Sequence, residues 1–185
     1  MRDRSDEQLM ANYAAGEIGA FDELYGRHRA PMYRFILRQV GDAVVAIDLY
    51  QGCWEKMIKA RHTYRKSVPF RAWMYRIARN HLVDHYRRSP PPAEACVGEL
   101  AEASAGPEEH LSRSEGAARL ASAIRQLPVE QRETLMLKLE GGLDLKAIAD
   151  ITGVNPETAK SRLRYAVSKL KLLLQGGEFQ PGGPA

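Results

Sequence analysis

Apolar side chains recur every three or four residues along most of the chain, which is the period of an α-helix, and few stretches alternate as a β-strand would. This spacing predicts helices over residues 20–40, 44–60 and 70–88. Pro31 lies within the first of them. Because a proline inside a helix removes a hydrogen bond and clashes with the preceding turn, we expect a kink or a break there. Together these segments predict a compact helical N-terminal domain, residues 1–88.

The helical pattern stops at residues 89–92, Ser-Pro-Pro-Pro, because consecutive prolines cannot continue a helix. The next residues are mostly Ala, Gly, Glu and Ser, with almost no large apolar side chains, so we expect a flexible, acidic, Pro-rich linker over residues 89–118. Helical spacing then returns and predicts a second domain over residues 119–175, followed by a disordered Gly- and Pro-rich tail over 176–185. The predicted fold class is therefore all-α, with two small helical domains joined by a flexible acidic linker.

The second domain has the pattern of a helix-turn-helix. Helices predicted over residues 130–139 and 145–152 are followed by Gly153, which suits the positive φ of a tight turn. Asn155 and Pro156 then suit the cap and the first position of a long last helix. A helix presented by such a turn is typical of DNA-binding domains, and many regulators share it.

The last predicted helix has an apolar face and an opposite polar, basic face. The apolar face, which we expect to pack on the core, consists of Ala159, Leu163, Ala166, Val167, Leu170 and Leu173. Recognition helices usually meet base edges with their first turns. The candidate DNA-binding residues of this helix are Glu157, Thr158, Lys160, Ser161, Arg162, Arg164 and Tyr165. Among them we expect Arg164 to read base edges and Arg162 to contact phosphate. An amphipathic helix with a solvated basic face is the alternative interpretation.

Charge is distributed in blocks along the chain. Residues 1–88 carry 16 Lys and Arg against 10 Asp and Glu, residues 89–118 carry one against six, and residues 119–185 carry 10 against seven. Two basic blocks that flank an acidic middle suggest two polyanion-binding units. Charge alone favours the alternative, an ordinary solvated surface.

Residues 70–88 combine an aromatic face with a stripe of basic and amide side chains. The expected packed face consists of Phe70, Trp73, Met74, Ile77 and His81. The candidate DNA-binding residues are a second stripe of this helix and the loop before it, namely Arg76, Asn80, Val83 and Arg87 with Arg61, Tyr64, Arg65 and Lys66. Arginine and asparagine suit phosphate contact and base readout, and aromatics among cations suit unpaired bases. The alternative is that the aromatics form core and the charges are solvated.

The sequence offers no catalytic or metal centre that we can defend. His81 and His85 are spaced to share one ion, but neither a Glu between them nor a third ligand completes a zinc motif. Cys53 and Cys96 belong to no CxxC pair, and we expect Cys53 to be a small buried residue. We therefore expect no cofactor, no metal and no enzymatic activity.

No apolar run approaches the ~20 residues needed to span a bilayer, and the first residues lead into no apolar stretch. These features predict no signal peptide, no membrane insertion and a cytoplasmic location.

Several motifs in order resemble a sigma-70-family factor of the extracytoplasmic-function group. Residues 48–54 match the family pattern D-L-x-Q-x-x-[FW], and residues 70–80 resemble its promoter-melting and minus-ten segment. Residues 127–132, Leu-Pro-Val-Glu-Gln-Arg, and the helix-turn-helix resemble region four, which reads the minus-thirty-five element. Gly52 departs from the pattern because an acidic residue often stands there, and as a poor helix former it is expected to loosen its helix.

The resemblance implies a factor that binds core RNA polymerase, through its beta and beta-prime subunits, and directs initiation at promoter DNA of a stress or envelope-response regulon. The residues that would contact the polymerase are Asp48, Leu49, Gln51 and Trp54. An anti-sigma factor is a possible further partner. The alternatives are a helix-turn-helix regulator that acts without core polymerase, which has no need of residues 48–54, and a nucleic-acid enzyme, for which no site is evident.

Overall fold

The helices of the N-terminal half follow the apolar spacing closely. The protein is represented by a computed structural model that describes residues 4–89 and 109–175, so the tail over 176–185 and most of the expected linker lie outside the described residues. Helices α2 (Ile18–Val40), α3 (Ala43–Ala60) and α4 (Phe70–Arg88) are present where they were predicted.

Pro31 does not break α2, which runs through it as one helix. Leu24 and His28 before the proline and Met32 and Phe35 after it are all buried on the same core. Burial of side chains on both sides offsets the roughly 3 kcal/mol that an internal proline costs.

The sequence analysis missed helix α1 (Asp6–Ala14). Its start carries a capping box, in which the Ser5 hydroxyl accepts from the Gln8 N–H and the Gln8 side chain accepts from the Ser5 N–H. The Ser-x-x-Gln spacing, which is typical of a capping box, could have predicted the start of this helix. Helix α1 also caps α4, because the Phe70 N–H donates to a Glu7 carboxylate oxygen at 3.0 Å.

The C-terminal half contains α5 (Glu109–Arg125), α6 (Val129–Leu139), α7 (Leu145–Thr152) and α8 (Pro156–Leu174). Helix α5 begins ten residues earlier than expected, so residues 109–118 of the predicted linker are helical, as their Glu, Ala, Leu and Arg content permits. The helix-turn-helix is confirmed. Gly153 has a φ of 72° between α7 and α8, and the Asn155 side chain accepts from the Thr158 N–H at 2.7 Å.

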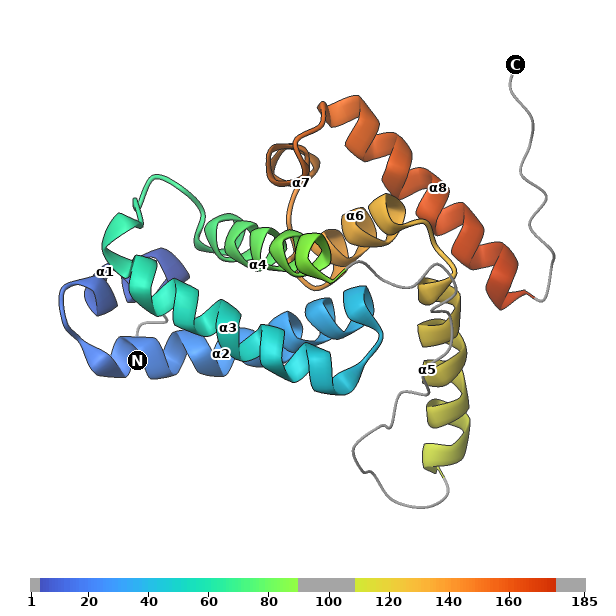
Figure 1. Ribbon diagram of the computed structural model, residues 1–185, viewed down its shortest axis with the longest axis horizontal. Helices are drawn as coiled ribbons and strands as arrows, with labels where there is room; N and C mark the ends of the chain where they lie inside the picture. Colours follow the sequence, from blue (N-terminus) through green and yellow to red (C-terminus); the bar gives the residue numbers. More distant parts are fainter. Residues whose placement is uncertain (1–3, 90–108, 176–185) are drawn as a thin grey trace.

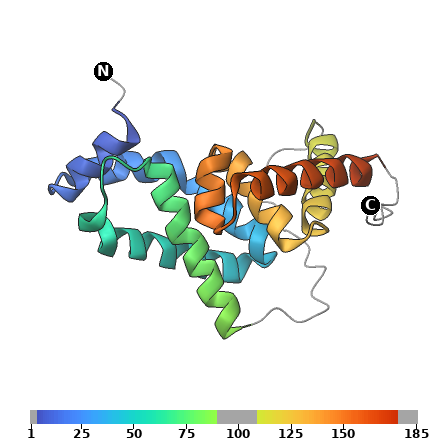
Figure 2. The same ribbon diagram turned by 90° about the horizontal axis from the view of Figure 1, so that it is seen from above.

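The two halves pack against one another (Figures 1 and 2), a feature that the sequence did not predict. Helix α4 contacts α2 and α3 on one side and α7 on the other. Tyr75 of α4 is 1% exposed, and a Cβ at Gly141, after α6, would lie 3.2 Å from its ring. Two ion pairs cross the same boundary, Arg34–Glu140 and Arg79–Glu133. Among the described residues, the buried apolar side chains of both halves form one continuous cluster.

Asp6 joins α1 to α2. One carboxylate oxygen lies 2.8 Å from His28 Nε2, and the other accepts from Arg27 at 2.9 Å. The hydrogen bond with His28 and then the contact with Arg27 hold the pKa of Asp6 at about 2, although partial burial opposes them.

We expect Asp6→Asn to lower the free energy of unfolding by about 1–3 kcal/mol at pH 7, because it weakens charge-assisted hydrogen bonds. A carboxylate with a depressed pKa stabilises the fold above its unfolded pKa of about 4, and this stabilisation is lost as the pH falls towards 2. Urea unfolding at pH 7 and pH 3 measures both effects. Asp22→Asn, at an exposed position of α2, is the control, and an equal loss in the two variants would contradict the role of Asp6.

Candidate nucleic-acid and polymerase interface

A groove between α3 and α4 contains one of the predicted minus-ten residues. It has a volume of about 470 Å³, and it is lined by Lys56, Lys59, Ala60, Ile77, Asn80, His81 and Asp84. Asn80 is exposed on α4, and the two lysines come from the facing side of α3. An open groove with two cations and an amide can hold a phosphate and hydrogen-bond a base edge.

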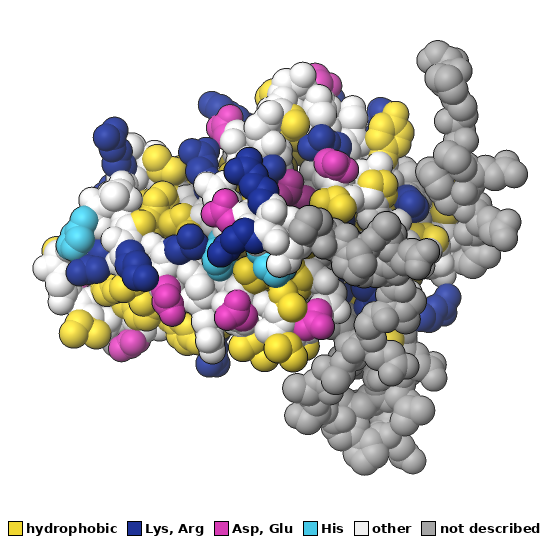
Figure 3. Space-filling view, viewed as in Figure 1, with side chains coloured by type: hydrophobic (Ala, Val, Ile, Leu, Met, Phe, Trp, Pro, Cys, Tyr) yellow, Lys and Arg dark blue, Asp and Glu magenta, His cyan; other side chains and the backbone are white. Residues whose placement is uncertain are grey.

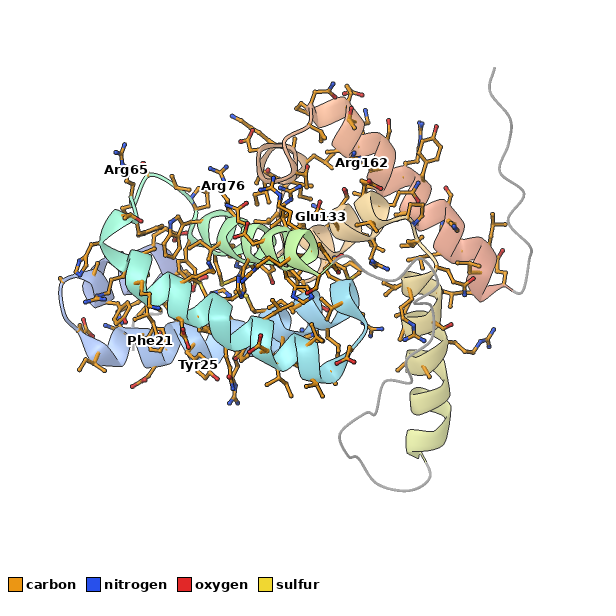
Figure 4. The ribbon with its side chains drawn as sticks, in the orientation of Figure 1. Phe21, Tyr25, Arg65, Arg76, Glu133 and Arg162 are labelled. Atoms are coloured by element: carbon orange, nitrogen blue, oxygen red, sulfur yellow. The ribbon has the colours of Figure 1, made fainter. Side chains whose placement is uncertain are left out.

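Arg65, Lys66 and Arg76, from the loop before α4 and from α4 itself, are exposed. Arg65 and Arg76 both point away from the core on the same side of the molecule (Figure 4). On the face of the molecule seen in Figure 3, Lys and Arg side chains are spread with acidic side chains between them. Further along α4, Arg87 is exposed and Val83 is half-buried.

Arg61 and Tyr64 have structural contacts that hold the loop between α3 and α4. The Tyr64 hydroxyl donates to the Val68 carbonyl at 2.8 Å, its ring packs edge-on against Trp73 at 5.3 Å, and burial raises its pKa to about 12. The Arg61 guanidinium donates to the Ile58 carbonyl and lies 5.9 Å from the Tyr13 ring centre. Among the predicted loop residues, Arg65 and Lys66 are therefore the ones that extend fully into solvent.

The packed face of α4 is broader than predicted. Phe70 and Met74 are buried as expected, but Trp73, Ile77 and His81 are only half-buried. The other buried positions of α4 are Ala72, Tyr75, Ala78 and Leu82. The packed face is broader than predicted because the C-terminal half covers α4 from the side opposite to α2 and α3.

Gly52 gives α4 room to approach α3. A Cβ at this position would lie 2.5 Å from His81 Nε2, which is closer than non-bonded atoms come. The expected loosening is not seen, since α3 continues unbroken from Ala43 to Ala60. Burial and the nearby Lys56 lower the pKa of His81. Within the described ranges, no three His, Cys, Asp or Glu side chains are grouped to hold a metal ion.

The four predicted polymerase-contact residues divide into two kinds. Asp48 and Gln51 are exposed on α3, whereas Leu49 is 2% and Trp54 is 6% exposed. The Trp54 ring packs edge-on against Phe21 and Tyr25 of α2, with centroids 5.8 and 4.9 Å away. Both side chains pack α3 on α2 in this structure, and direct contact of Leu49 and Trp54 with the polymerase stays a prediction.

Two exposed apolar residues beside Asp48 were not predicted. Val44 is 78% and Ile47 is 48% exposed on α3. Their positions one turn before Asp48 and Gln51 place them on the same face of the helix. Apolar residues at solvent-facing positions of an amphipathic helix could have indicated these two exposed side chains in the sequence.

The first turns of α8 expose much of the predicted basic face. Glu157, Lys160 and Arg164 are exposed, Thr158 and Ser161 are half-buried, and Tyr165 is 55% exposed with the Arg164 guanidinium 5.1 Å from its ring centre.

Arg162 lies at the edge of the exposed face of α8, whereas Val167 does not lie where it was expected. Arg162 is half-buried and acts electrostatically on the carboxylate of Glu133, towards α6 (Figure 4). Val167 is 38% exposed, so its assignment to the core face is wrong. The buried stripe of α8 is narrower and follows Ala159 and Ala166.

The exposed helix-turn-helix and the basic groove define a helical DNA-binding protein with two candidate reading units. Residues 24–89 match the model of Sigma-70 region 2, and residues 117–170 match that of Sigma-70 region 4. The chain belongs to the sigma-70 family, in its extracytoplasmic-function group, whose members act in initiation of transcription by RNA polymerase. This membership decides against a helix-turn-helix regulator that acts without the polymerase.

Individual relatives agree with this placement. The chain is 34% identical to ECF RNA polymerase sigma factor SigL of Mycobacterium tuberculosis, over 88% of this chain and 93% of that protein. It is 31% identical to ECF RNA polymerase sigma factor BldN of Streptomyces coelicolor, over 90% of this chain but 65% of BldN. The solved structure of CnrH in complex with the cytosolic domain of CnrY matches with a TM-score of 0.70 and 26% identity, over 95% of this chain and 100% of CnrH. No described helix is long and apolar enough to span a bilayer.

Proposed function

We propose that this chain is a non-enzymatic subunit that binds the beta and beta-prime subunits of core RNA polymerase in the cytoplasm and directs it to promoters of a stress or envelope-response regulon. In this proposal residues 1–88 bind the polymerase and open the minus-ten element, and residues 119–175 read the minus-thirty-five element. The observation that carries it is the groove between α3 and α4, where Asn80 and two lysines face the same space.

The assignment of individual residues follows from their exposure. Asp48 and Gln51 are the proposed polymerase contacts, with Val44 and Ile47 beside them. The proposed minus-ten contacts are Arg65, Lys66, Arg76, Asn80 and Arg87, and the proposed minus-thirty-five contacts are Glu157, Lys160, Ser161 and Arg164 with Arg162. The solved structure of CnrH in complex with the cytosolic domain of CnrY supports a further protein partner, which we propose is an anti-sigma factor.

Transcription in vitro from a library of promoter sequences tests the function. Core polymerase with this chain is expected to initiate at a defined subset of promoters, and neither component alone should do so. Equal affinity for duplex promoter with and without core polymerase, and no specific transcript, would contradict the proposal.

Asn80→Ala is expected to impair promoter opening more than duplex binding, because its amide faces the groove in which an unpaired base would be held. The measurements are permanganate reactivity of unpaired thymines and affinity for the closed duplex, both with core polymerase. Lys66→Ala is the comparison, since loss of an exposed phosphate contact should weaken binding and opening alike. Equal losses for Asn80→Ala in both measurements would assign Asn80 to the fold.

A further inference from the structure

Helix α4 begins without a side-chain cap from its own N-cap residue. That residue is Pro69, whose ring offers no hydrogen-bond acceptor. Glu7 of α1 supplies the acceptor from 63 residues away, because its carboxylate accepts from the Phe70 N–H at 3.0 Å. This hydrogen bond holds the pKa of Glu7 below its ordinary value, although burial opposes it. A carboxylate at this end also suits the positive pole of the helix dipole.

The last turn of α1 contacts the other end of the loop that leads to α4. This loop runs from η1 (Arg61–Thr63) to the start of α4, and α1 contacts both of these elements. The Arg61 guanidinium lies 5.9 Å from the centre of the Tyr13 ring, within the range of a cation–π contact. Glu7 and Tyr13 are six residues apart, or about 9 Å along the helix. One short helix therefore sets the separation of the two ends of the loop.

The middle of the loop is built on the first turn of α4. The Tyr64 ring packs edge-on against Trp73 at 5.3 Å, and its hydroxyl donates to the Val68 carbonyl at 2.8 Å. The Val68 N–H in turn donates to the Arg65 carbonyl at 2.9 Å. A shift of the first turn of α4 would therefore shift the exposed cations of the loop with it.

Helix α1 is fixed on α2 by contacts that do not involve Glu7. Leu9 and Met10 are 0% and 3% exposed in the core, and the Asp6 carboxylate lies 2.8 Å from His28 Nε2 of α2. Neighbouring carboxylates of α1 thus serve different elements, Asp6 on α2 and Glu7 on α4. Loss of the Glu7 carboxylate alone should release one end of the loop while α1 stays in place.

We propose that α1 positions the loop over residues 61–69 for contact with promoter DNA, with Glu7 and Tyr13 as the positioning residues at its two ends. The role in DNA contact rests on the proposed function, whereas the hold of α1 on both ends is a property of the free chain. Arg65 and Lys66 bind DNA better from a loop with one conformation, because ordering a mobile loop on binding costs affinity.

Hydrogen–deuterium exchange of the free full chain tests the positioning. In Glu7→Ala the amides of residues 64–70 should exchange about five- to tenfold faster, as loss of a helix cap would allow. Glu7→Gln should restore slow exchange, since its amide oxygen can still accept from the Phe70 N–H. In Tyr13→Leu the amides of η1 should exchange about two- to fivefold faster, because the cation–π contact is lost.

A control variant separates this effect from a general loss of stability. Ile36→Val shortens a fully buried side chain in the last turns of α2, at a cost in stability similar to that of a lost cap. It should leave exchange in the loop unchanged. Circular dichroism verifies that each variant keeps its helices.

Promoter affinity of the complex with core polymerase tests the role in DNA contact. We expect Glu7→Ala to lower this affinity about fivefold and to leave affinity for core polymerase alone unchanged. If Glu7 acts through the loop, the same substitution should change promoter affinity by less than about twofold in a chain that also carries Arg65→Ala and Lys66→Ala.

Unchanged exchange in Glu7→Ala would overturn the positioning role, as would equally faster exchange of the loop in Ile36→Val. Faster exchange with unchanged promoter affinity, or an undiminished effect in the chain without the two loop cations, would overturn the link to DNA. Exchange needs neither polymerase nor DNA, so it decides the positioning by itself. Absence of a specific transcript from the unmodified chain would count against the proposed function alone.

Discussion

Asp48→Arg is expected to abolish binding of the chain to core RNA polymerase while leaving its helix content unchanged. Asp48 is exposed on α3, and its carboxylate acts electrostatically on His81 of α4. An arginine there would face a surface that is complementary to a carboxylate, and like charges at an interface cost several kcal/mol, which corresponds to a loss of about a hundredfold or more in affinity.

Co-purification and a titration with labelled core polymerase measure the effect. Asp22→Arg is the matched control, because it makes the same charge change at an exposed position of α2. Gln51→Ala and Ile47→Ala should each weaken binding less than Asp48→Arg, since neither introduces repulsion. Full affinity in Asp48→Arg would show that this face of α3 does not meet the polymerase.

The extent of most helices could be predicted because it depends on local features of the sequence. The caps at Asn155 and Gly153 and the apolar spacing of α2, α3 and α4 are readable within a few residues. The absence of a break at Pro31 could not be predicted in this way, because whether a proline breaks a helix depends on how much both flanks bury.

Contacts between distant parts of the chain could not be predicted in this way. The Arg34–Glu140 pair joins residues 106 positions apart, and Arg79–Glu133 joins residues 54 apart. The clearest sequence marks at such contacts are glycines, since Gly52 gives space to His81 and Gly141 gives space to Tyr75. A glycine does not reveal which side chain will fill the space it leaves.

The sequence named the residues of the candidate polymerase contact, but it did not predict which of them are exposed. A family pattern names Asp48, Leu49, Gln51 and Trp54 together, whereas only the packing of α3 on α2 separates the two exposed residues from the two buried ones. Exposure on a helix with apolar residues on several faces depends on which neighbours cover it, and the sequence alone does not give those neighbours.

Arg164→Ala is expected to relax base preference within the minus-thirty-five element, whereas Arg162→Ala should weaken binding to all sequences alike. Arg164 is exposed in the first turns of α8, and a long cation that reads a guanine edge contributes about 1–3 kcal/mol of discrimination. Its position over the Tyr165 ring limits the conformations of the guanidinium before DNA arrives. Arg162 lies towards Glu133 and is half-buried, so it must leave that carboxylate to reach a phosphate.

These roles can be separated by measuring the affinity of both variants for promoters with single-base substitutions in the upstream element. The measurements are made with core polymerase and at several salt concentrations. Arg162→Ala should reduce the slope of log affinity against log salt by about one unit, as loss of one phosphate contact does. Because Glu133 competes with phosphate for Arg162, the effect of Arg162→Ala should be larger in the Glu133→Lys chain than in the unmodified one. A change of base preference in Arg162→Ala without one in Arg164→Ala would mean that α8 enters the groove rotated by about a third of a turn from the orientation expected here. No effect of either substitution would mean that another element reads the upstream sequence.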